Sequence, residues 1–257
     1  MDSWGTQTGT DNGAAGGAAR ATLVVGHRGA PRVARENTLP ALRAGIDAGA
    51  HWLEVDVRLT RCGTPVLLHD ATLHRLWGDR RTAASLTVDQ IAQITRTAQA
   101  GGPGRERIPT LCQGLELARD AGRTLMIDLP TPAEAYPALA LVREFGLLGE
   151  VVFAGNRTAL GLVRAEAPRA RIALSWESPL LPGARVLDRT RPDYLNVEHH
   201  RLSRGLVQRA HRLGLGVSAW TVDRARRMAR LTALGVDVII TNDPATLVRV
   251  LADRADG

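Results

Sequence analysis

The chain has 257 residues, 44% of them hydrophobic and 23% charged, and its formal charge of +7 rests on 33 arginines without a single lysine. These values fit one large soluble domain, and no run approaches the roughly 20 apolar residues of a membrane-spanning helix, so no stable membrane association is expected. The positive charge indicates either a solvated arginine surface or attraction of anionic substrates. With only two Tyr and two Phe, the chain has few aromatic side chains on which bases could stack, so we do not expect a nucleic-acid partner.

The amino-terminal 20 residues are small, polar and glycine-rich, and we expect them to form a flexible tail ahead of one domain at residues 21–257. They lack the basic start and apolar run of a secretory signal. Cys62 and Cys112 are too few for a disulfide framework, and nothing around them resembles a zinc motif. A reduced, cytoplasmic protein is therefore predicted.

From residue 21 onward, short apolar runs alternate with amphipathic stretches, several of which end at glycine as helices often do. Repeated strand–helix alternation predicts a parallel sheet, and seven or eight units over about 235 residues favour an α/β fold of the (β/α)8 TIM barrel type. We expect strands at residues 22–26, 52–57, 65–69, 124–129, 151–155, 171–176, 194–198, 216–222 and 237–241, and helices at 38–50, 110–122, 132–146, 157–167, 204–214, 223–235 and 244–254.

The alternation is interrupted once. Only a turn-like segment, without a helix, separates the strands at 52–57 and 65–69. A longer excursion, from Thr72 to Pro109, then precedes the strand at 124–129, and it holds one helical pattern at 87–94 and a glycine-rich loop at 100–109. We therefore expect a small insertion after the second barrel strand and no second domain.

Polar residues gather where strands end, which is where barrel enzymes place their chemistry. Glu54 and Asp56 stand two apart in one strand and so share a face. Two buried carboxylates repel each other unless a positive charge neutralises them, and a cation with oxygen ligands (Mg²⁺, Ca²⁺ or Mn²⁺) is the simplest answer. The full set of polar residues at strand ends is His27, Arg28, Glu54, Asp56, His69, Asp128, Glu177, Glu198, Trp220, Asn242 and Asp243.

Some of these residues and their neighbours have two readings. Arg28 could pair with a carboxylate or hold a phosphate with its forked guanidinium. Asp70 could orient the histidine before it or cap a turn. Asn37 or Thr38 is a natural N-cap for the helix that follows. Trp220 could form an apolar wall for a substrate alcohol or fill the barrel mouth.

From about Leu23 to Leu251 the chain resembles the glycerophosphodiester phosphodiesterase family. The matching motifs, in order, are GHRG and ENT six residues apart within residues 26–38, E-x-D at 54–56, HD at 69–70, IPTL at 108–111, AWTVD at 219–223 and GVDVIITNDP at 235–244. The resemblance implies a (β/α)8 barrel with a small insertion after its second strand. It also implies hydrolysis of small-molecule glycerophosphodiesters to glycerol 3-phosphate and an alcohol, with a divalent cation.

By motif, the resemblance makes His27 and His69 the general acid and base, lets Arg28 hold the phosphate, and makes Glu54, Asp56 and Asp128 the metal ligands. The chain departs from the family at the third ligand, where the family usually shows Glu-x-Lys and this sequence has Asp128 and Pro130. Aspartate is one methylene shorter than glutamate, and the lysine is missing. An arginine could replace its charge, and Arg157 is a candidate.

Two other functions fit parts of the sequence. A lysophospholipase D or related lipid phosphodiesterase would be helped by an exposed apolar loop at the barrel mouth, for which Trp77 is the only indication. A barrel that binds phosphodiesters without turnover is suggested by Asp128 and Pro130. The sequence leaves the alcohol, the metal and the oligomeric state open.

Overall fold

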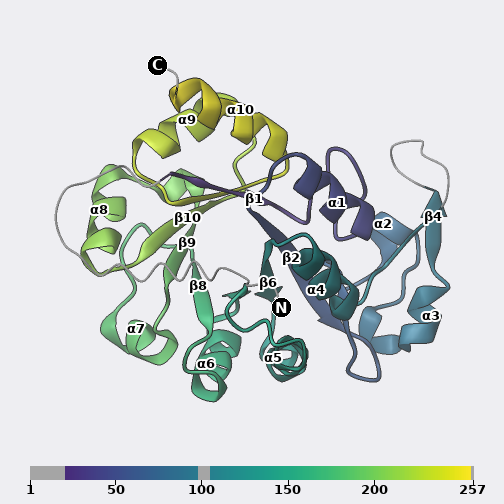
Figure 1. Ribbon diagram of the computed structural model, residues 1–257. Helices are drawn as coiled ribbons and strands as arrows, with labels where there is room; N and C mark the ends of the chain where they lie inside the picture. Colours follow the sequence, from purple (N-terminus) through teal and green to yellow (C-terminus); the bar gives the residue numbers. More distant parts are fainter. Residues whose placement is uncertain (1–20, 98–104, 256–257) are drawn as a thin grey trace, which may run out of the picture.

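Eight parallel strands close a barrel in the computed structural model, which describes residues 21–97 and 105–255 (Figure 1). The barrel order is β1, β2, β6, β7, β8, β9, β10 and β11, and β11 pairs with β1. The tail expected at residues 1–20 and part of the loop expected at 100–109 lie outside the described residues. The strands are β1 (Leu23–Gly26), β2 (Trp52–Leu59), β6 (Thr124–Leu129), β7 (Val151–Gly155), β8 (Arg171–Trp176), β9 (Tyr194–Glu198), β10 (Gly216–Trp220) and β11 (Val238–Thr241).

Helices pack around the outside of this barrel. The (β/α)8 fold predicted from the sequence is thus confirmed, as is an insertion after the second strand. One helix, α7, was not expected, because its short segment carries little apolar periodicity. The outer helices are α1 (Leu39–Asp47), α4 (Leu111–Asp120), α5 (Ala135–Glu144), α6 (Arg157–Glu166), α7 (Ala184–Thr190), α8 (Arg204–Arg212), α9 (Ala225–Ala233) and α10 (Pro244–Ala255), with short 3-10 turns η2 (Pro132–Glu134) and η3 (His199–Arg201).

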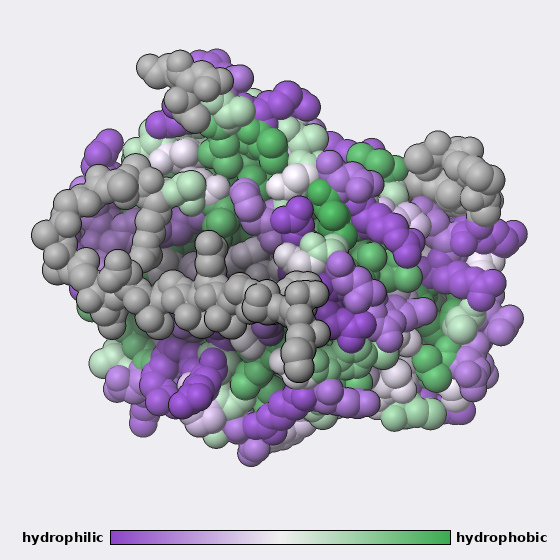
Figure 2. Space-filling model, in the orientation of Figure 1, coloured by the Kyte–Doolittle hydropathy of each residue, from purple (hydrophilic) through white to green (hydrophobic). Residues whose placement is uncertain are grey.

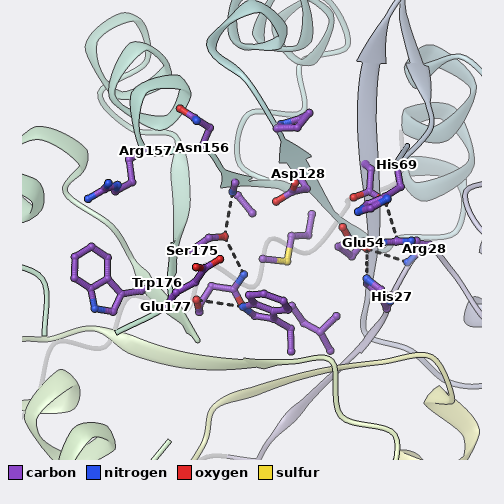
Figure 3. A pocket seen from close by; sticks show the side chains of 18 of the residues that line it. His27, Arg28, Glu54, His69, Asp128, Asn156, Arg157, Ser175, Trp176 and Glu177 are labelled. Carbon is purple, nitrogen blue, oxygen red and sulfur yellow. Dashed lines mark hydrogen bonds and ion pairs between the residues drawn. The ribbon is translucent and has the colours of Figure 1, made fainter. Parts of the chain in front are cut away.

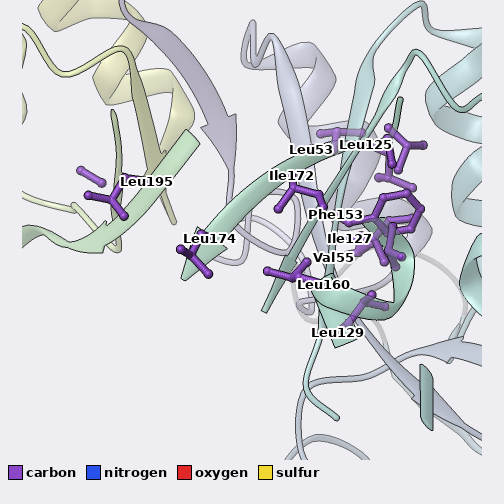
Figure 4. Packing of buried hydrophobic residues seen from close by; sticks show 14 of the residues in the cluster. Leu53, Val55, Leu125, Ile127, Leu129, Phe153, Leu160, Ile172, Leu174 and Leu195 are labelled. Carbon is purple, nitrogen blue, oxygen red and sulfur yellow. The ribbon is translucent and has the colours of Figure 1, made fainter. Parts of the chain in front are cut away.

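The strand sequences fix two separate cores, because successive side chains of a strand point to opposite faces. Leu53 and Val55 of β2 face outward, into the apolar layer between barrel and helices that Figure 4 shows. Trp52 faces inward and belongs to a smaller cluster inside the barrel. Glu54 and Asp56 have the same parity as Trp52, so the strand directs both carboxylates into the barrel interior.

The insertion begins as a hairpin that overshoots the barrel rim. Pairing of β2 with β6 ends at Asp56, while β2 continues to Leu59 and β3 (Pro65–Leu67) returns antiparallel beside it. The strand expected at residues 65–69 is therefore shorter and lies outside the barrel wall. Its return direction explains why His69 still reaches the rim, since the Leu68 N–H donates to the Asp56 carbonyl at 3.0 Å.

The rest of the insertion forms a small body with its own core beside the barrel, next to α1 and α4 in Figure 1. Buried apolar residues, including Leu73, Trp77 and Ile91, hold it together. Over the face seen in Figure 2, hydrophilic residues predominate along the outer edge of the molecule. No helix in the described ranges is both long and apolar enough to cross a bilayer. The elements of the insertion are α2 (His74–Trp77), η1 (Ala83–Ser85), α3 (Val88–Ala92), β4 (Thr95–Thr97) and β5 (Arg105–Arg107).

Candidate active site

A cavity of about 740 Å³ opens at the carboxyl ends of the barrel strands. All seven residues singled out for catalysis, substrate binding or metal binding line it, so segments far apart in sequence converge as expected (Figure 3). Glu177 also lines the cavity. Glu198 instead pairs with Arg201, at 3.0 Å. The seven residues are His27, Arg28, Glu54, Asp56, His69, Asp128 and Trp220.

A tight turn after β1 delivers His27 and Arg28 to this cavity. A Cβ on Gly26 would lie 2.4 Å from the Gly29 carbonyl oxygen, and Gly29 itself has φ +89°, so both positions require glycine. Arg28 adopts the left-handed region as well, with φ 54°. This conformation directs its backbone N–H at Glu54, which accepts it through Oε2 at 2.9 Å.

An amide fixes the His27 ring. Its Nδ1 lies 2.7 Å from the Asn242 Oδ1, and the Asn242 Nδ2 donates to Asp223, which sets the orientation of the amide. Since the amide oxygen can only accept, Nδ1 carries the proton and Nε2 presents its lone pair. Burial, and after it the charge of Arg28, lowers the pKa of His27. Both effects favour the neutral form of the ring.

A carboxylate fixes the His69 ring instead. Its Nδ1 lies 2.7 Å from the Asp70 Oδ1, and the side chain is 46% exposed. Of the two readings of Asp70, the structure therefore shows the one in which it orients the histidine. Arg58 donates to the His69 carbonyl through Nε at 2.9 Å and Nη2 at 2.7 Å, which holds the backbone. The hydrogen bond from Arg75 leads the effects that lower the pKa of Asp70 to about 2.

Arg28 pairs with carboxylates but keeps one donor unused. Its Nη1 donates to Glu36 at 2.8 Å. Its Nε lies 2.9 Å from Asp56, yet the N–H makes no hydrogen bond and is buried. The charge of this N–H is thus compensated by Asp56, while its hydrogen bond is left unmade. Of the two roles considered from the sequence, the structure thus shows the pairing with carboxylates.

Three carboxylates face one another across two neighbouring strands. Glu54 and Asp56 are 6% exposed, and Asp56 lies directly opposite Asp128 in the register of β2 and β6. Burial, followed by the charges of Asp56 and Asp128, raises the pKa of Glu54 well above its usual range. Burial, followed by the charge of Asp56, raises the pKa of Asp128 to about 7. The excess negative charge favours a bound cation.

The donor set fits a hard divalent cation, because Glu54, Asp56 and Asp128 supply oxygen alone. Within residues 21–97 and 105–255, no group of three or more His, Cys, Asp or Glu side chains is arranged so that it could hold a metal ion. Instead, the guanidinium of Arg28 lies against Asp56. Chemistry and burial thus fit the ion, while the ligand geometry is not formed.

Sequence reasoning missed several residues that hold this site. Thr38 is the N-cap of α1, whereas Asn37, with φ 57°, is buried and donates to Asp56 Oδ2 at 2.8 Å. Its Oδ1 also accepts the Asp56 N–H at 3.2 Å. Glu36 connects Arg28 to Arg75. The ENT motif contains both Glu36 and Asn37, so the motif itself was the available signal.

The structure also places Trp77 and Arg157, which the sequence singled out. Trp77 is 5% exposed and packs in the insertion core below the guanidinium of Arg35, so it is no exposed apolar loop. Arg157 lines the cavity, but its guanidinium stacks on Trp176, 5.7 Å from the ring centroid. The arginines whose charges act on the pKa of Asp128 are Arg28 and Arg58. Arg58 was not singled out from the sequence, because it lies after Glu54 and Asp56 on the part of β2 that continues past the barrel rim.

Comparison with known proteins agrees with this geometry. The model of the glycerophosphoryl diester phosphodiesterase family matches residues 27–246. A glycerophosphodiester phosphodiesterase of Caldanaerobacter subterraneus subsp. tengcongensis is 30% identical over 237 residues, covering 90% of this chain and 98% of the relative. A solved putative glycerophosphoryl diester phosphodiesterase from Silicibacter pomeroyi is 26% identical, with a TM-score of 0.81 over 91% of this chain and 94% of that one.

A second solved structure extends the likeness of the fold. It is a phosphodiesterase from Oleispira antarctica, in complex with its product sn-glycerol-3-phosphate. Its TM-score is 0.82 at 21% identity, over 90% of this chain and 97% of that one. At this identity the comparison supports the barrel fold.

Proposed function

Because this chain belongs to the glycerophosphoryl diester phosphodiesterase family and is an enzyme of that class, we propose that it hydrolyses glycerophosphodiesters to glycerol 3-phosphate and an alcohol by metal-dependent, paired-histidine catalysis. The observation that carries the mechanism is the different partner of each histidine. His27 is fixed by an amide and His69 by a carboxylate, and both rings line one cavity.

These partners assign the two roles. The lowered pKa of His27 favours the neutral ring, and Asn242 engages its Nδ1, so Nε2 is the nitrogen that accepts: His27 is the general base that removes a proton from the attacking oxygen. His69 has Asp70 to compensate the charge of a doubly protonated ring, so it is the general acid. It gives its Nε2 proton to the departing alkoxide, which is too basic to leave readily without one. Water and a neighbouring glycerol hydroxyl both remain possible nucleophiles.

The remaining residues bind and stabilise. Glu54, Asp56 and Asp128 would hold Mg²⁺, Ca²⁺ or Mn²⁺, which when bound neutralises charge that develops on the phosphate oxygens. The unused Nε–H of Arg28 would donate to one of those oxygens. Trp220 would form an apolar wall of the substrate site. A cytoplasmic location stays a prediction from the cysteine usage.

Glycerol 3-phosphate release tests the proposal directly. A panel of glycerophosphodiesters is incubated with the protein and Mg²⁺, Ca²⁺, Mn²⁺ or EDTA, and the product is measured by a coupled assay. We expect metal-dependent release and loss of most of it in His27→Asn and in His69→Asn. His74→Asn is the matched control, since His74 is exposed on α2 and does not line the cavity.

Two outcomes would point elsewhere. Release from lysolipids alone would favour the lipid phosphodiesterase, although the burial of Trp77 removes the feature that suggested it. Folded protein that binds metal yet releases nothing from any substrate would favour a non-catalytic barrel.

A further inference from the structure

The two histidines belong to different parts of the molecule. His27 follows β1 of the barrel, whereas His69 follows β3 of the insertion. Catalysis by the pair requires that both rings keep a fixed relation to one phosphate, although each ring has a separate anchor. A further contact must therefore fix the position of the His69 side chain relative to the barrel.

One arginine of the insertion contacts both parts. Arg75 of α2 donates to Asp70 through Nε (2.6 Å to Oδ2) and through Nη2 (3.1 Å to Oδ1). The adjacent edge of the same guanidinium donates to Glu36 through Nη1 (3.0 Å to Oε2) and Nη2 (2.6 Å to Oε1). Asp70 holds His69, and Glu36 holds Arg28.

These contacts form one continuous chain of hydrogen bonds from the His69 ring to Arg28. It runs through His69, Asp70, Arg75, Glu36 and Arg28, with every link between 2.6 and 3.1 Å. We propose that Arg75 is a positioning residue that aligns the general acid of the insertion with the phosphate-binding arginine of the barrel. The proposal rests on the function assigned above to His69 and Arg28.

A guanidinium is required at this position. Its planar fork supplies parallel N–H donors on two edges, so it can bind two carboxylates in one plane. A lysine ammonium is a point charge and could not orient both. Although burial opposes it, the hydrogen bond from Arg75 and the charge of Arg28 also lower the pKa of Glu36. Both carboxylates thus stay ionised and keep accepting.

Other contacts hold the insertion against the barrel, so the positioning role of Arg75 can be tested separately from the folding of the insertion. Arg35 donates to the buried Glu106 at 2.8 Å and to the Leu76 carbonyl at 2.9 Å. Arg58 holds the backbone of His69 from β2. Loss of the Arg75 guanidinium would therefore leave the insertion docked and free the Asp70 side chain to turn.

The test compares Arg75→Gln with Arg81→Gln. Arg81 is a matched control, since it is also an insertion arginine with several bonds to one carboxylate, but that carboxylate is Asp79 and not Asp70 or Glu36. We expect Arg75→Gln to lower kcat roughly 100-fold, with KM and Tm close to those of the wild type, because misplacement by about 1 Å costs that much. Arg81→Gln should leave kcat and KM unchanged. Arg75→Ala should regain part of its activity when guanidinium ions are added.

Histidine tautomers give a readout that does not need activity. Nitrogen-15 NMR of the wild type should show the Nδ1–H tautomer or the charged ring for His69, and Arg75→Gln should show a mixture that includes Nε2–H. This measurement tests the positioning role even if no substrate is turned over, so its failure differs from failure of the proposed function. Unchanged kcat and an unchanged His69 spectrum in Arg75→Gln would overturn the proposal. So would a parallel loss of Tm and activity without rescue by guanidinium.

Discussion

Replacement of Asp128 by asparagine should stabilise the metal-free protein at high pH. The pKa of Asp128 rises from 3.8 to about 7 because burial and Asp56 disfavour its ionised form. In the unfolded chain the same carboxyl ionises at its ordinary pKa. Its stabilising contribution is therefore fully present below about pH 3.8 and is lost as the pH rises through about 7. The asparagine amide does not ionise, so the variant does not lose this stability as the pH rises.

The size of the effect follows from the shift. About three pKa units correspond to roughly 4 kcal/mol, which is an upper limit for the gain in the free energy of unfolding at pH 8. The asparagine amide must also be desolvated, so we expect about 2 kcal/mol. In a protein of this length that gain raises Tm by roughly 4–8 °C. At pH 4.5 the difference should largely disappear, since the wild-type carboxyl is then protonated.

Thermal and urea unfolding in EDTA at pH 4.5, 6.5 and 8 would measure this dependence. Added Mg²⁺, Ca²⁺ or Mn²⁺ should raise the Tm of the wild type and leave Asp128→Asn little changed, because the variant lacks one ligand. Asp128→Asn that is less stable than the wild type in EDTA at pH 8 would refute the reasoning. So would a difference that does not vary with pH.

Three further changes have definite expected outcomes. His27→Asn and His69→Asn should each lower kcat at least about 100-fold without a change in Tm, measured by glycerol 3-phosphate release and calorimetry, since general acid–base groups contribute that much. Asn37→Ala should lower the free energy of unfolding by about 2 kcal/mol in urea, because alanine cannot donate to Asp56 and is strained at φ 57°. Asn37→Gly should lower it less, because glycine adopts this φ without strain. Glu106→Gln should cost about 3 kcal/mol in the same assay, because it removes the buried charge that pairs with Arg35 at 2.8 Å.

The barrel was predictable because the sequence repeats one local rule many times. Each short apolar run followed by an amphipathic stretch specifies a strand and its helix, and the parity of β2 alone sends Glu54 and Asp56 to one face. The convergence of His27 and Asp128 on the same cavity then follows from the closure of parallel strands. The catalytic candidates needed no knowledge of side-chain contacts.

The insertion was less predictable, because its position depends on contacts between residues far apart in sequence. An antiparallel hairpin that overshoots the rim and returns cannot be told from a barrel strand by its apolar run. The pattern around Trp77 also does not reveal that Arg35 covers it. The ion pairs of Arg75 and Arg35 join segments that are 39 and 71 residues apart, and charge alone does not select these partners among 33 arginines.

Arginine in place of lysine has a consequence for how the site responds to pH. The guanidinium groups of Arg28 and Arg75 stay charged throughout the range in which proteins fold, so their bonds to Glu36 and Asp70 persist. Among the carboxyls proposed as metal ligands, Asp128 has a pKa of about 7 and so changes its charge near neutral pH. A cation that binds near Asp128 would keep that carboxyl ionised, because it favours the negative form. Metal binding should therefore release protons from Asp128 below about pH 7 and widen the pH range over which the carboxylates remain charged.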